Sequence, residues 1–364
     1  MKHQDKRTYF FLVGSFNLGG TEKVAMQVGE ELIRLGHDVK FVSLVNERDY
    51  SVDSGRIFVL LNKRPVNLLV GFLQAYVALL KLIRTHRPIS VVSFSVSLNL
   101  FLFFQFYTKS VFVIDTNVFY FKKKWYYKYL LKVFILFPHI SKVVIPSKGL
   151  YEACAGFFYG TAKLFVIGNP VDQVTIDLLK DEELDEPFLT KEAFIVSAGR
   201  LVKMKGFSGL IVAFSRSKVS SQYKLVIVGK GRYEETLKQQ VRALKLEDRV
   251  FFVGFKKNPY KYFRRSKLFV LNSSFESFGN VLIEALASGV PVLSSDCDFG
   301  PRDIIMEGLN GKLFSVNEQA DLIKKLEEVM FSEEQYAHLK ANAVKSIEKF
   351  SLDKIALKWL EILK

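Results

Sequence analysis

Residues 268–305 read LFVLNSSFESFGNVLIEALASGVPVLSSDCDFGPRDII and predict a strand, a loop, a helix and a second strand. The apolar run 268–271 is typical of a strand buried on both faces of a parallel sheet. Residues 272–279 are small and polar, so we expect a loop. Apolar residues recur at helical spacing from Asn280, and a Gly-Val-Pro sequence ends the helix before a strand that begins at Pro291.

Two carboxylates of this unit lie eight residues apart. Glu276 falls in the loop, and Glu284 falls one turn inside the helix, on nearly the same face as Asn280. We expect the first amides of the helix, those of Gly279, Asn280 and Val281, to point out of the helix start, where they would suit a phosphate. A diphosphate bound there would have one carboxylate near each flank, one for a ribose diol and one for a sugar. Taken alone, a solvated helix carboxylate and a loop charge explain the pair better.

The surrounding motifs change that balance. The pattern F-E-S-F-G-N-x-x-x-E-A-x-A-x-G-x-P-V resembles the E-x7-E signature of the retaining glycosyltransferases of family 4, which have the GT-B fold. Further pieces follow in the family's order, namely Gly199-Arg200 with Lys205-Gly206, Val228-Gly229-Lys230-Gly231, Val253-Gly254-Phe255 and an early Gly19-Gly20-Thr21-Glu22. The resemblance is strong over residues 193–310 and weaker over residues 9–172. It implies an α/β protein with two Rossmann-like domains whose parallel sheets face each other across a cleft.

The amino-acid composition limits the classes of protein to which this chain could belong. The chain has 364 residues, of which 49% are hydrophobic and 24% charged, which fits two globular domains. Cys154, Cys297 and five histidines show neither a disulfide framework nor metal-ligand spacing, so we expect no metal. The net charge is +15, and residues 1–180 alone hold 23 Lys and Arg against 12 Asp and Glu. That excess suits nucleic acid, an anionic membrane surface or a phosphate-bearing acceptor.

The chain order predicts two domains. Strands, glycine loops and helices alternate in residues 1–172 and again in residues 173–349, which favours a parallel sheet in each. Between them the acidic stretch 181–186 is typical of a solvated connection. The resemblance implies that a last helix, at about residues 350–364, packs back on the first domain. It also implies that the first domain binds the acceptor and the second binds a nucleotide-sugar.

Two cations follow one predicted strand of the second domain. Arg200 and Lys205 lie between that strand and the next helix, where they suit a diphosphate leaving group. Charge builds on the diphosphate as the glycosyl bond breaks, so these donors would act in the transition state. The alternative is a pair of surface cations. The resemblance assigns Arg200 and Lys205 the diphosphate role and places Glu276 at the donor sugar, near the reacting carbon.

Other strand ends carry glycines. The resemblance implies that Gly229, Lys230 and Phe255 line the pocket of the nucleotide base, although each alone is only a strand-end turn. The sequence around Gly229 lacks the third glycine of a dinucleotide fingerprint, which disfavours a nicotinamide cofactor. The resemblance places Gly19 and Gly20 across the cleft, near the diphosphate and the sugar. Spacing alone reads them equally well as a tight turn.

Two features depart from simple family expectations. Many members have a histidine after the fourth or fifth strand, where this chain has Asp115 and Asn117, either of which is a candidate acceptor contact. Asp296-Cys297-Asp298 spells D-x-D, a metal signature elsewhere, but we interpret it as a loop near the donor sugar and expect no metal. Residues 298–303 resemble the form of this loop in enzymes that use UDP-hexose or UDP-N-acetylhexosamine, so we expect a UDP-linked donor and no other cofactor.

The stretch 119–137, FYFKKKWYYKYLLKVFILF, mixes lysines with aromatic residues. Such a helix suits an anionic membrane surface, through the region Lys122–Lys132, and a basic solvated face over a packed one is equally plausible. The basic first half favours peripheral membrane contact and an acceptor carried on a lipid. The N-terminus is not typical of a signal peptide, and we read the uncharged run 88–108 as a strand, a turn and a helix. We therefore expect a cytoplasmic protein on the inner face of the membrane.

These patterns combine into one hypothesis. It is a retaining transferase that moves a hexose or N-acetylhexosamine from a nucleotide-sugar to a hydroxyl of a lipid-linked glycan, in bacterial-type surface polysaccharide or glycoconjugate assembly. The resemblance implies retention of anomeric configuration by same-face attack, and a double displacement through an enzymic nucleophile is the alternative. The rivals are a transferase with a soluble acceptor and a non-catalytic scaffold that binds a nucleotide-sugar or lipid. Nucleic-acid binding is disfavoured because no base-stacking module appears in the sequence.

Overall fold

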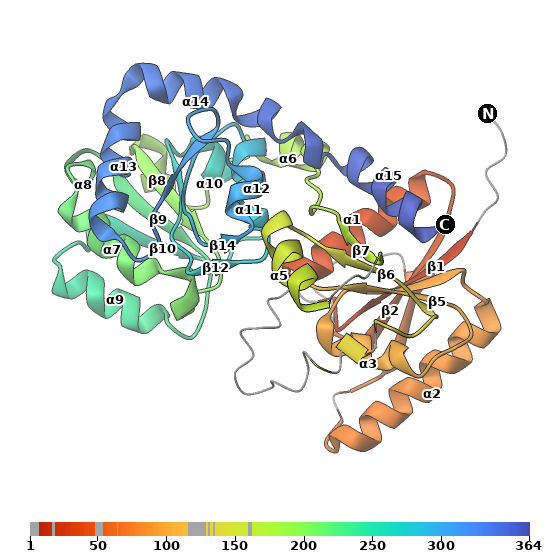
Figure 1. Cartoon of the computed structure of the whole chain (residues 1–364). Coiled ribbons are helices and arrows are strands. Elements are labelled where there is room, and N and C mark those ends of the chain that lie inside the picture. The colour runs from red at the N-terminus through yellow and green to blue at the C-terminus, as the bar shows by residue number, and fades with distance from the viewer. Residues whose placement is uncertain are drawn as a thin grey trace. The chain divides into compact units, whose positions relative to one another are not determined.

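The computed structural model describes residues 7–16, 19–47, 54–63, 65–115, 129, 132–133, 135–158 and 162–364. The chain divides into two compact units, residues 1–170 with 352–364, and residues 171–351 (Figure 1). Each unit contains a parallel sheet with helices on its faces. The predicted α/β class with two parallel sheets is confirmed.

In its described residues the first unit holds a seven-stranded sheet in the order β3-β2-β1-β4-β5-β6-β7. The strands are β1 (Thr8–Val13), β2 (Asp38–Val45), β3 (Ile57–Leu61), β4 (Ser90–Ser93), β5 (Lys109–Val113), β6 (Ile140–Ile145) and β7 (Leu164–Val166). Their apolar runs alternate between the two faces of the sheet, and both faces are covered by helices. The helices are α1 (Gly20–Arg34), α2 (Leu68–His86), α3 (Val96–Phe103), α5 (Lys148–Phe158) and α15 (Leu352–Leu363), with a 3-10 turn η1 (Ser54–Arg56).

Strand β1 shows how the helices are divided between the faces. Phe11 points to the side of α1 and α15, where its ring lies 6.5 Å from the indole of Trp359. Phe10 points to the opposite side, where it contacts His86 of α2. The C-terminal helix α15 is thus part of the core of the first unit, although its sequence follows the second (Figure 1).

The described residues of the second unit form a six-stranded sheet in the order β10-β9-β8-β11-β13-β15, and a small pair β12-β14. The strands are β8 (Phe194–Ala198), β9 (Lys224–Val228), β10 (Val250–Gly254), β11 (Phe269–Leu271), β12 (Phe275–Glu276), β13 (Val292–Ser295), β14 (Asp298–Phe299) and β15 (Gly311–Phe314). The helices are α6 (Gln173–Leu179), α7 (Phe207–Arg216), α8 (Val219–Gln222), α9 (Glu234–Ala243), α10 (Tyr260–Arg265), α11 (Asn280–Ala287), α12 (Pro301–Ile304), α13 (Gln319–Phe331) and α14 (Glu333–Ser346), with 3-10 turns η4 (Pro187–Lys191), η5 (Lys203–Lys205) and η6 (Glu348–Phe350).

Alternation along β8 again separates two cores. Val196 packs with residues of α6, α10 and α11 on one face of the sheet. Ile195 packs with residues of α7, α9 and α13 on the other. The elements β11, α11 and β13 begin within one residue of the positions predicted from residues 268–305, which is within the usual uncertainty of helix and strand ends.

The acidic stretch 181–186 is mostly exposed, as its composition predicts, and it also forms ion pairs with lysines that are distant in sequence. Leu184 is buried, and Asp185 lies 2.8 Å from Lys256 and 2.5 Å from Lys261. Hydrogen bonds from these two lysines lower the pKa of the Asp185 carboxyl to about 2. The lysines that neutralise the stretch are about 70 residues away in sequence, so its composition alone gives no sign that it packs against α10.

The predicted loop 272–279 also contains structure. Its residues 275–276 form β12, which pairs with β14 in the predicted loop that follows β13. The Phe275 and Phe299 rings lie edge to face, with their centroids 5.7 Å apart. A pair of two-residue strands is too short to leave a periodic pattern in the sequence.

Candidate active site

The candidate site lies at a topological switch point of the second sheet. Strand β8 lies between β9 and β11 in the sheet. The chain adds β9 and β10 on one side of β8, and later adds β11, β13 and β15 on the other side. Ligands of open α/β sheets bind at the carboxyl ends of the strands where the strand order reverses in this way. The predicted site residues of the second unit all follow strands β8, β9, β10 and β11, namely Arg200, Lys205, Gly229, Lys230, Phe255, Glu276, Gly279, Asn280, Val281 and Glu284.

Lys205 and Glu276 meet across this switch point. The Lys205 ammonium lies 2.5 Å from Glu276 Oε1, and both side chains are largely buried. The hydroxyl of Ser273 donates a second hydrogen bond to the same oxygen, at 2.7 Å. A cation that follows β8 and a carboxylate that follows β11 therefore form one charged centre, 71 residues apart in sequence.

The turn that carries Lys205 is held against the segment after β11. The Asn272 side chain donates to the Gly206 carbonyl at 2.8 Å, and the Ser274 amide donates to the Met204 carbonyl at 2.9 Å. Gly206 has φ +64°, and a Cβ on it would lie 1.8 Å from the Asn272 carbonyl oxygen. Only glycine permits this close approach, which places Lys205 beside Glu276.

The backbone of Glu276 is held from the other side by β14. The Gly300 amide donates to the Glu276 carbonyl at 3.0 Å, next to the β12-β14 pairing. Cys297 lies close by, and burial together with the charge of Glu276 raises the pKa of its thiol to about 12. This thiol is therefore neutral and is not a nucleophile at physiological pH.

Arg200 does not join the charged centre. Its side chain is exposed, and it forms no ion pair with any residue in the described ranges. Its backbone is fixed, because the neighbouring Leu201 amide donates to the Lys230 carbonyl at 3.0 Å and the Leu201 carbonyl accepts from the Tyr233 amide at 3.0 Å. Arg200 thus offers a guanidinium group on a rigid turn at the same edge of the sheet.

Gly229, Lys230 and Phe255 come together at the ends of β9 and β10. The Gly229 amide donates to the Gly254 carbonyl at 2.7 Å. The Lys230 ammonium lies 5.4 Å from the centre of the Phe255 ring. A Cβ on Gly229 would lie 2.0 Å from the Gly199 carbonyl oxygen, so the turns after β8 and β9 touch through backbone.

Helix α11 begins at the same edge. Gly279 precedes it with φ +100°, a left-handed conformation that suits glycine, and its carbonyl accepts from the Leu282 amide at 2.9 Å. The helix dipole adds positive potential at this end of α11. Glu284 lies on the second turn of α11 and is partly exposed. Helix α11 begins at Asn280, the residue from which the sequence predicts it.

The remaining predicted ligand residues lie in the first unit. Gly19 and Gly20 begin α1, and Glu22 folds back so that a Cβ on Gly19 would lie 2.0 Å from Glu22 Oε2. The hydroxyl of Thr21 donates to Asp115 Oδ2 at 2.5 Å, so the segment after β5 meets the start of α1. Asn117 lies outside the described residues.

The D-x-D sequence has a partner inside the protein. The Arg302 guanidinium donates to both carboxylate oxygens of Asp296, with 2.6 Å from Nη2 to Oδ2. A bidentate arginine occupies the oxygens that a metal ion would need from Asp296. Over the described ranges no group of three or more His, Cys, Asp or Glu side chains is placed to hold a metal ion.

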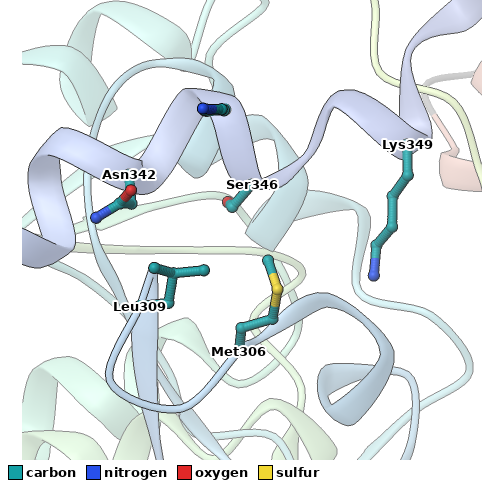
Figure 2. A pocket seen from close by; sticks show the side chains of 6 residues that line it. Met306, Leu309, Asn342, Ser346 and Lys349 are labelled. Atoms are coloured by element: carbon teal, nitrogen blue, oxygen red, sulfur yellow. The ribbon is translucent and has the colours of Figure 1, made fainter.

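Other features of interest lie away from this edge. A hollow between α14 and the turn after α12 is lined by Met306 and Leu309 on one side and by Asn342, Ser346 and Lys349 on the other (Figure 2). Its polar groups bind the protein itself, since Ser346 accepts from Asn310 and Lys349 donates to the Asp303 carbonyl. It contains no predicted site residue.

The basic and aromatic stretch at Lys122–Lys132 lies almost wholly outside the described residues. Within it the structure describes Tyr129 and Lys132, and both side chains contact the Phe157 ring of α5. No helix in the described ranges has the length and hydropathy needed to cross a bilayer.

Three site residues were not predicted from sequence. Ser273 binds Glu276, Thr21 binds Asp115, and Arg302 binds Asp296. Thr21 and Arg302 lie inside quoted motifs, so they could have been found by asking which neighbour satisfies each carboxylate. Ser273 carries no such signal, because small polar residues are common after strands.

Two family profiles cover most of the chain. Residues 18–174 match the family described as Glycosyltransferase Family 4. Residues 180–346 match the family described as Glycosyl transferases group 1. These matches confirm the resemblance that the E-x7-E motif indicates.

Individual proteins agree with the profiles. The chain is 28% identical, over 95% of its length and 97% of the relative's, to N-acetylgalactosamine-N,N'-diacetylbacillosaminyl-diphospho-undecaprenol 4-alpha-N-acetylgalactosaminyltransferase of Campylobacter jejuni. It is 30% identical, over 53% of each chain, to lipopolysaccharide 1,6-galactosyltransferase of Salmonella typhimurium. Its fold matches Alr3699/HepE of Anabaena, solved with UDP and glucose, with a TM-score of 0.82 and 20% identity over 98% of this chain and 99% of that one. The GT-B fold is thereby confirmed.

Proposed function

We infer the reaction of this chain from the family to which it belongs, the group 1 (family 4) glycosyltransferases, and from the charged centre of its second unit. Members of this family transfer a sugar from a nucleotide-sugar with retention of anomeric configuration. We propose that this chain transfers a hexose or an N-acetylhexosamine from a UDP-sugar to a glycan hydroxyl. The observation that carries the assignment is the Lys205–Glu276 pair at the switch point, beside the start of α11.

The proposed donor site uses each group for a different part of the nucleotide-sugar. Lys205, Arg200 and the first amides of α11 bind the diphosphate, whose charge grows as the bond from the sugar to the phosphate breaks. Glu284 binds the ribose hydroxyls, and Glu276 contacts the donor sugar near its reacting carbon. The turns that carry Lys230 and Phe255 line the base pocket, where the ammonium and the ring already lie 5.4 Å apart.

The proposed chemistry needs no group beyond these. The acceptor hydroxyl attacks the anomeric carbon on the face from which the diphosphate departs. One carbon–oxygen bond forms as another breaks, and the hydroxyl proton passes to the departing phosphate oxygen. Lys205 and Arg200 stabilise the charge on that phosphate, and Glu276 holds Lys205 in place before the bond breaks.

The donor base and the acceptor are inferred from related proteins. Alr3699/HepE binds UDP and glucose, which supports uracil as the base. The Campylobacter relative acts on a diphospho-undecaprenol glycan, and the Salmonella relative acts on lipopolysaccharide. We therefore propose a lipid-linked acceptor bound by the first unit, in surface polysaccharide or glycoconjugate assembly at the inner face of the membrane.

A soluble acceptor is the second candidate. The chain is 31% identical, over 45% of its length and 43% of the relative's, to N-acetyl-alpha-D-glucosaminyl L-malate synthase of Bacillus anthracis. The name of that protein includes L-malate, which is a small water-soluble molecule. Partition of the labelled product between butanol and water separates the two candidates, since a lipid-linked product enters the butanol.

A turnover assay tests the proposed function. Purified protein is incubated with UDP-glucose, UDP-galactose, UDP-GlcNAc or UDP-GalNAc and a diphospho-undecaprenol-linked glycan, and release of UDP is measured with mass analysis of the product. We expect one donor to be consumed, and Glu276→Ala or Arg200→Ala to lower its turnover at least ~100-fold. A wild-type rate no higher than that of Glu276→Ala, with every donor and acceptor, would remove the assignment and favour a binding role.

A further inference from the structure

The outward face of α2 is apolar over its first three turns. Leu69, Leu73 and Val77 follow one another at the four-residue spacing that aligns side chains along a helix, and they expose 69%, 53% and 64% of their surface. Val66 and Val70, beside them, are exposed as well. The stripe from Leu69 to Val77 covers about 12 Å of helix at 1.5 Å per residue.

The inward face of the same helix already packs against the first unit. Ala75, Leu79 and Ile83 are buried beside the sheet. The Phe72 ring lies 4.5 Å from the Phe101 ring of α3. A helix that is apolar on all sides is normally covered on all sides, so the exposed stripe indicates contact with something outside the unit.

The segment after α3 extends the stripe with aromatic side chains. Phe104, Phe106 and Tyr107 are each more than half exposed. The Tyr76 hydroxyl donates to the Phe104 carbonyl at 2.9 Å, and the Arg84 guanidinium lies 4.4 Å above the Tyr107 ring. These contacts join α2 and the segment into one surface; Figure 1 shows α2 and α3, the helix that precedes this segment, next to each other. The α2 face is defined here as Leu69, Leu73, Val77, Phe104 and Phe106.

Charge identifies the occupant of the α2 face. Residues 54–114, which include α2 and the segment after α3, contain seven Lys and Arg and no acidic residue. Lys63 precedes the apolar stripe, and Lys81, Arg84 and Arg87 follow it, all of them exposed. An apolar stripe with cationic ends and exposed aromatic rings matches an anionic lipid surface, where aliphatic groups enter the acyl region and the cations and rings meet the headgroups.

We propose that the α2 face inserts into an anionic lipid surface, with α2 parallel to the membrane plane. The stripe is shorter than the ~30 Å hydrocarbon core, so α2 does not span it. This proposal deepens the proposed function, because it gives the first unit a defined contact with the membrane that carries a lipid-linked acceptor. It rests on residues separate from the Lys122–Lys132 region.

Vesicle sedimentation of the full-length protein tests the proposal. The vesicles are phosphatidylcholine alone, or phosphatidylcholine with one third phosphatidylglycerol. The test variant is Leu69→Gln/Leu73→Gln/Val77→Gln, and the matched control is Val174→Gln/Leu178→Gln on α6, where the two side chains are 71% and 76% exposed. We expect wild type and control to bind the anionic vesicles more weakly as salt rises, and the test variant to bind at least ~10-fold more weakly than either.

Two outcomes would overturn the proposal. One is equal vesicle binding by wild type and a folded test variant, with folding checked by thermal melting. The other is a wild-type dimer in light scattering that the test variant abolishes without any vesicle binding, which would make the α2 face a contact between two copies. UDP binding, measured on the same samples, keeps the proposals separate: vesicle binding without UDP binding contradicts the proposed function and leaves the α2 face supported.

Discussion

Lys205 and Glu276 form a largely buried ion pair, in which each side chain stabilises the charge of the other. The lysine has three donors, and one of them is directed at Glu276 Oε1. We expect a departing diphosphate to take another, so that the lysine bridges the carboxylate and the leaving group. The pair then fixes the position of the positive charge before the bond breaks, which is how preorganised groups lower a barrier.

A substitution of Lys205 tests this role. We expect Lys205→Met to lower kcat at least ~100-fold, because methionine keeps the unbranched apolar part of the side chain and removes the ammonium that would stabilise the leaving group. The matched control is Lys203→Met in the same 3-10 turn, whose ammonium lies near the Tyr233 ring instead. Steady-state rates on the preferred donor measure both. A Lys205→Met rate within a few-fold of the control would exclude the lysine from the chemistry.

The buried thiols give a pH-dependent prediction. Burial raises the pKa of Cys154 to about 12, and burial with the charge of Glu276 does the same for Cys297. An unfolded cysteine has a pKa of about 8.5, so the stabilisation from the neutral thiols is complete below that pH and is lost as pH rises towards 12. At pH 8 we expect both thiols to react with a disulfide reagent only after denaturant is added. Fast reaction of either thiol in the folded protein would contradict their burial.

At the scale of elements, backbone contacts between strand-end turns shape the site. Gly229 has φ +142° and touches the Gly199 carbonyl, so we expect Gly229→Ala to separate the turns after β8 and β9. The cost should exceed ~1 kcal/mol, which lowers Tm by at least ~2–4 °C, and UDP affinity should fall with it.

Gly156→Ala provides the opposite control. This glycine lies within α5, and a Cβ on it would meet no atom within 4 Å. Alanine has the higher helix propensity, so we expect a gain of up to ~1 kcal/mol and unchanged UDP affinity. Differential scanning fluorimetry measures both variants. Equal melting temperatures for the two alanine variants would contradict the backbone contact at Gly229.

The strands and helices also show how much of the fold could be predicted from the sequence. The apolar runs and glycine turns predicted most strands and helices, because each long element carries its own periodic pattern. The pair β12-β14 could not be predicted, since two-residue strands have no period. The acidic stretch 181–186 is mostly exposed, as predicted, but its ion pairs could not be predicted, because Lys256 and Lys261, which neutralise Asp185, are distant in sequence.

The candidate site was likewise predicted in part from the sequence. The resemblance assigned both Lys205 and Glu276 to the site of the nucleotide-sugar. In the structure the Lys205 ammonium lies 2.5 Å from Glu276 Oε1. Spacing gave no reason for Ser273 to donate to Glu276, because the local sequence of small polar residues allows many partners. The roles of Gly19 and Gly20, which lie in the first unit, remain predictions.

At the scale of the whole molecule, the two units differ in charge as well as in their proposed ligands. The first unit, residues 1–170 with 352–364, holds 25 Lys and Arg and 12 Asp and Glu, while the full chain holds 52 and 37, so most of the excess lies in the first unit. The proposed donor site uses only a few fixed cations at one sheet edge. The broad positive charge of the first half instead suits an extended anionic surface, as the α2 face requires.

The central claim is a nucleotide site at the carboxyl edge of the second sheet, and thermal unfolding with UDP, GDP and ADP tests it most directly. At 100 times its dissociation constant a ligand stabilises the native state by about 2.7 kcal/mol. The account predicts this shift with UDP and UDP-sugars, little shift with GDP or ADP, and a smaller UDP shift in Glu284→Ala, which removes the ribose contact. No shift with any nucleotide, or an undiminished UDP shift in Glu284→Ala, would contradict it.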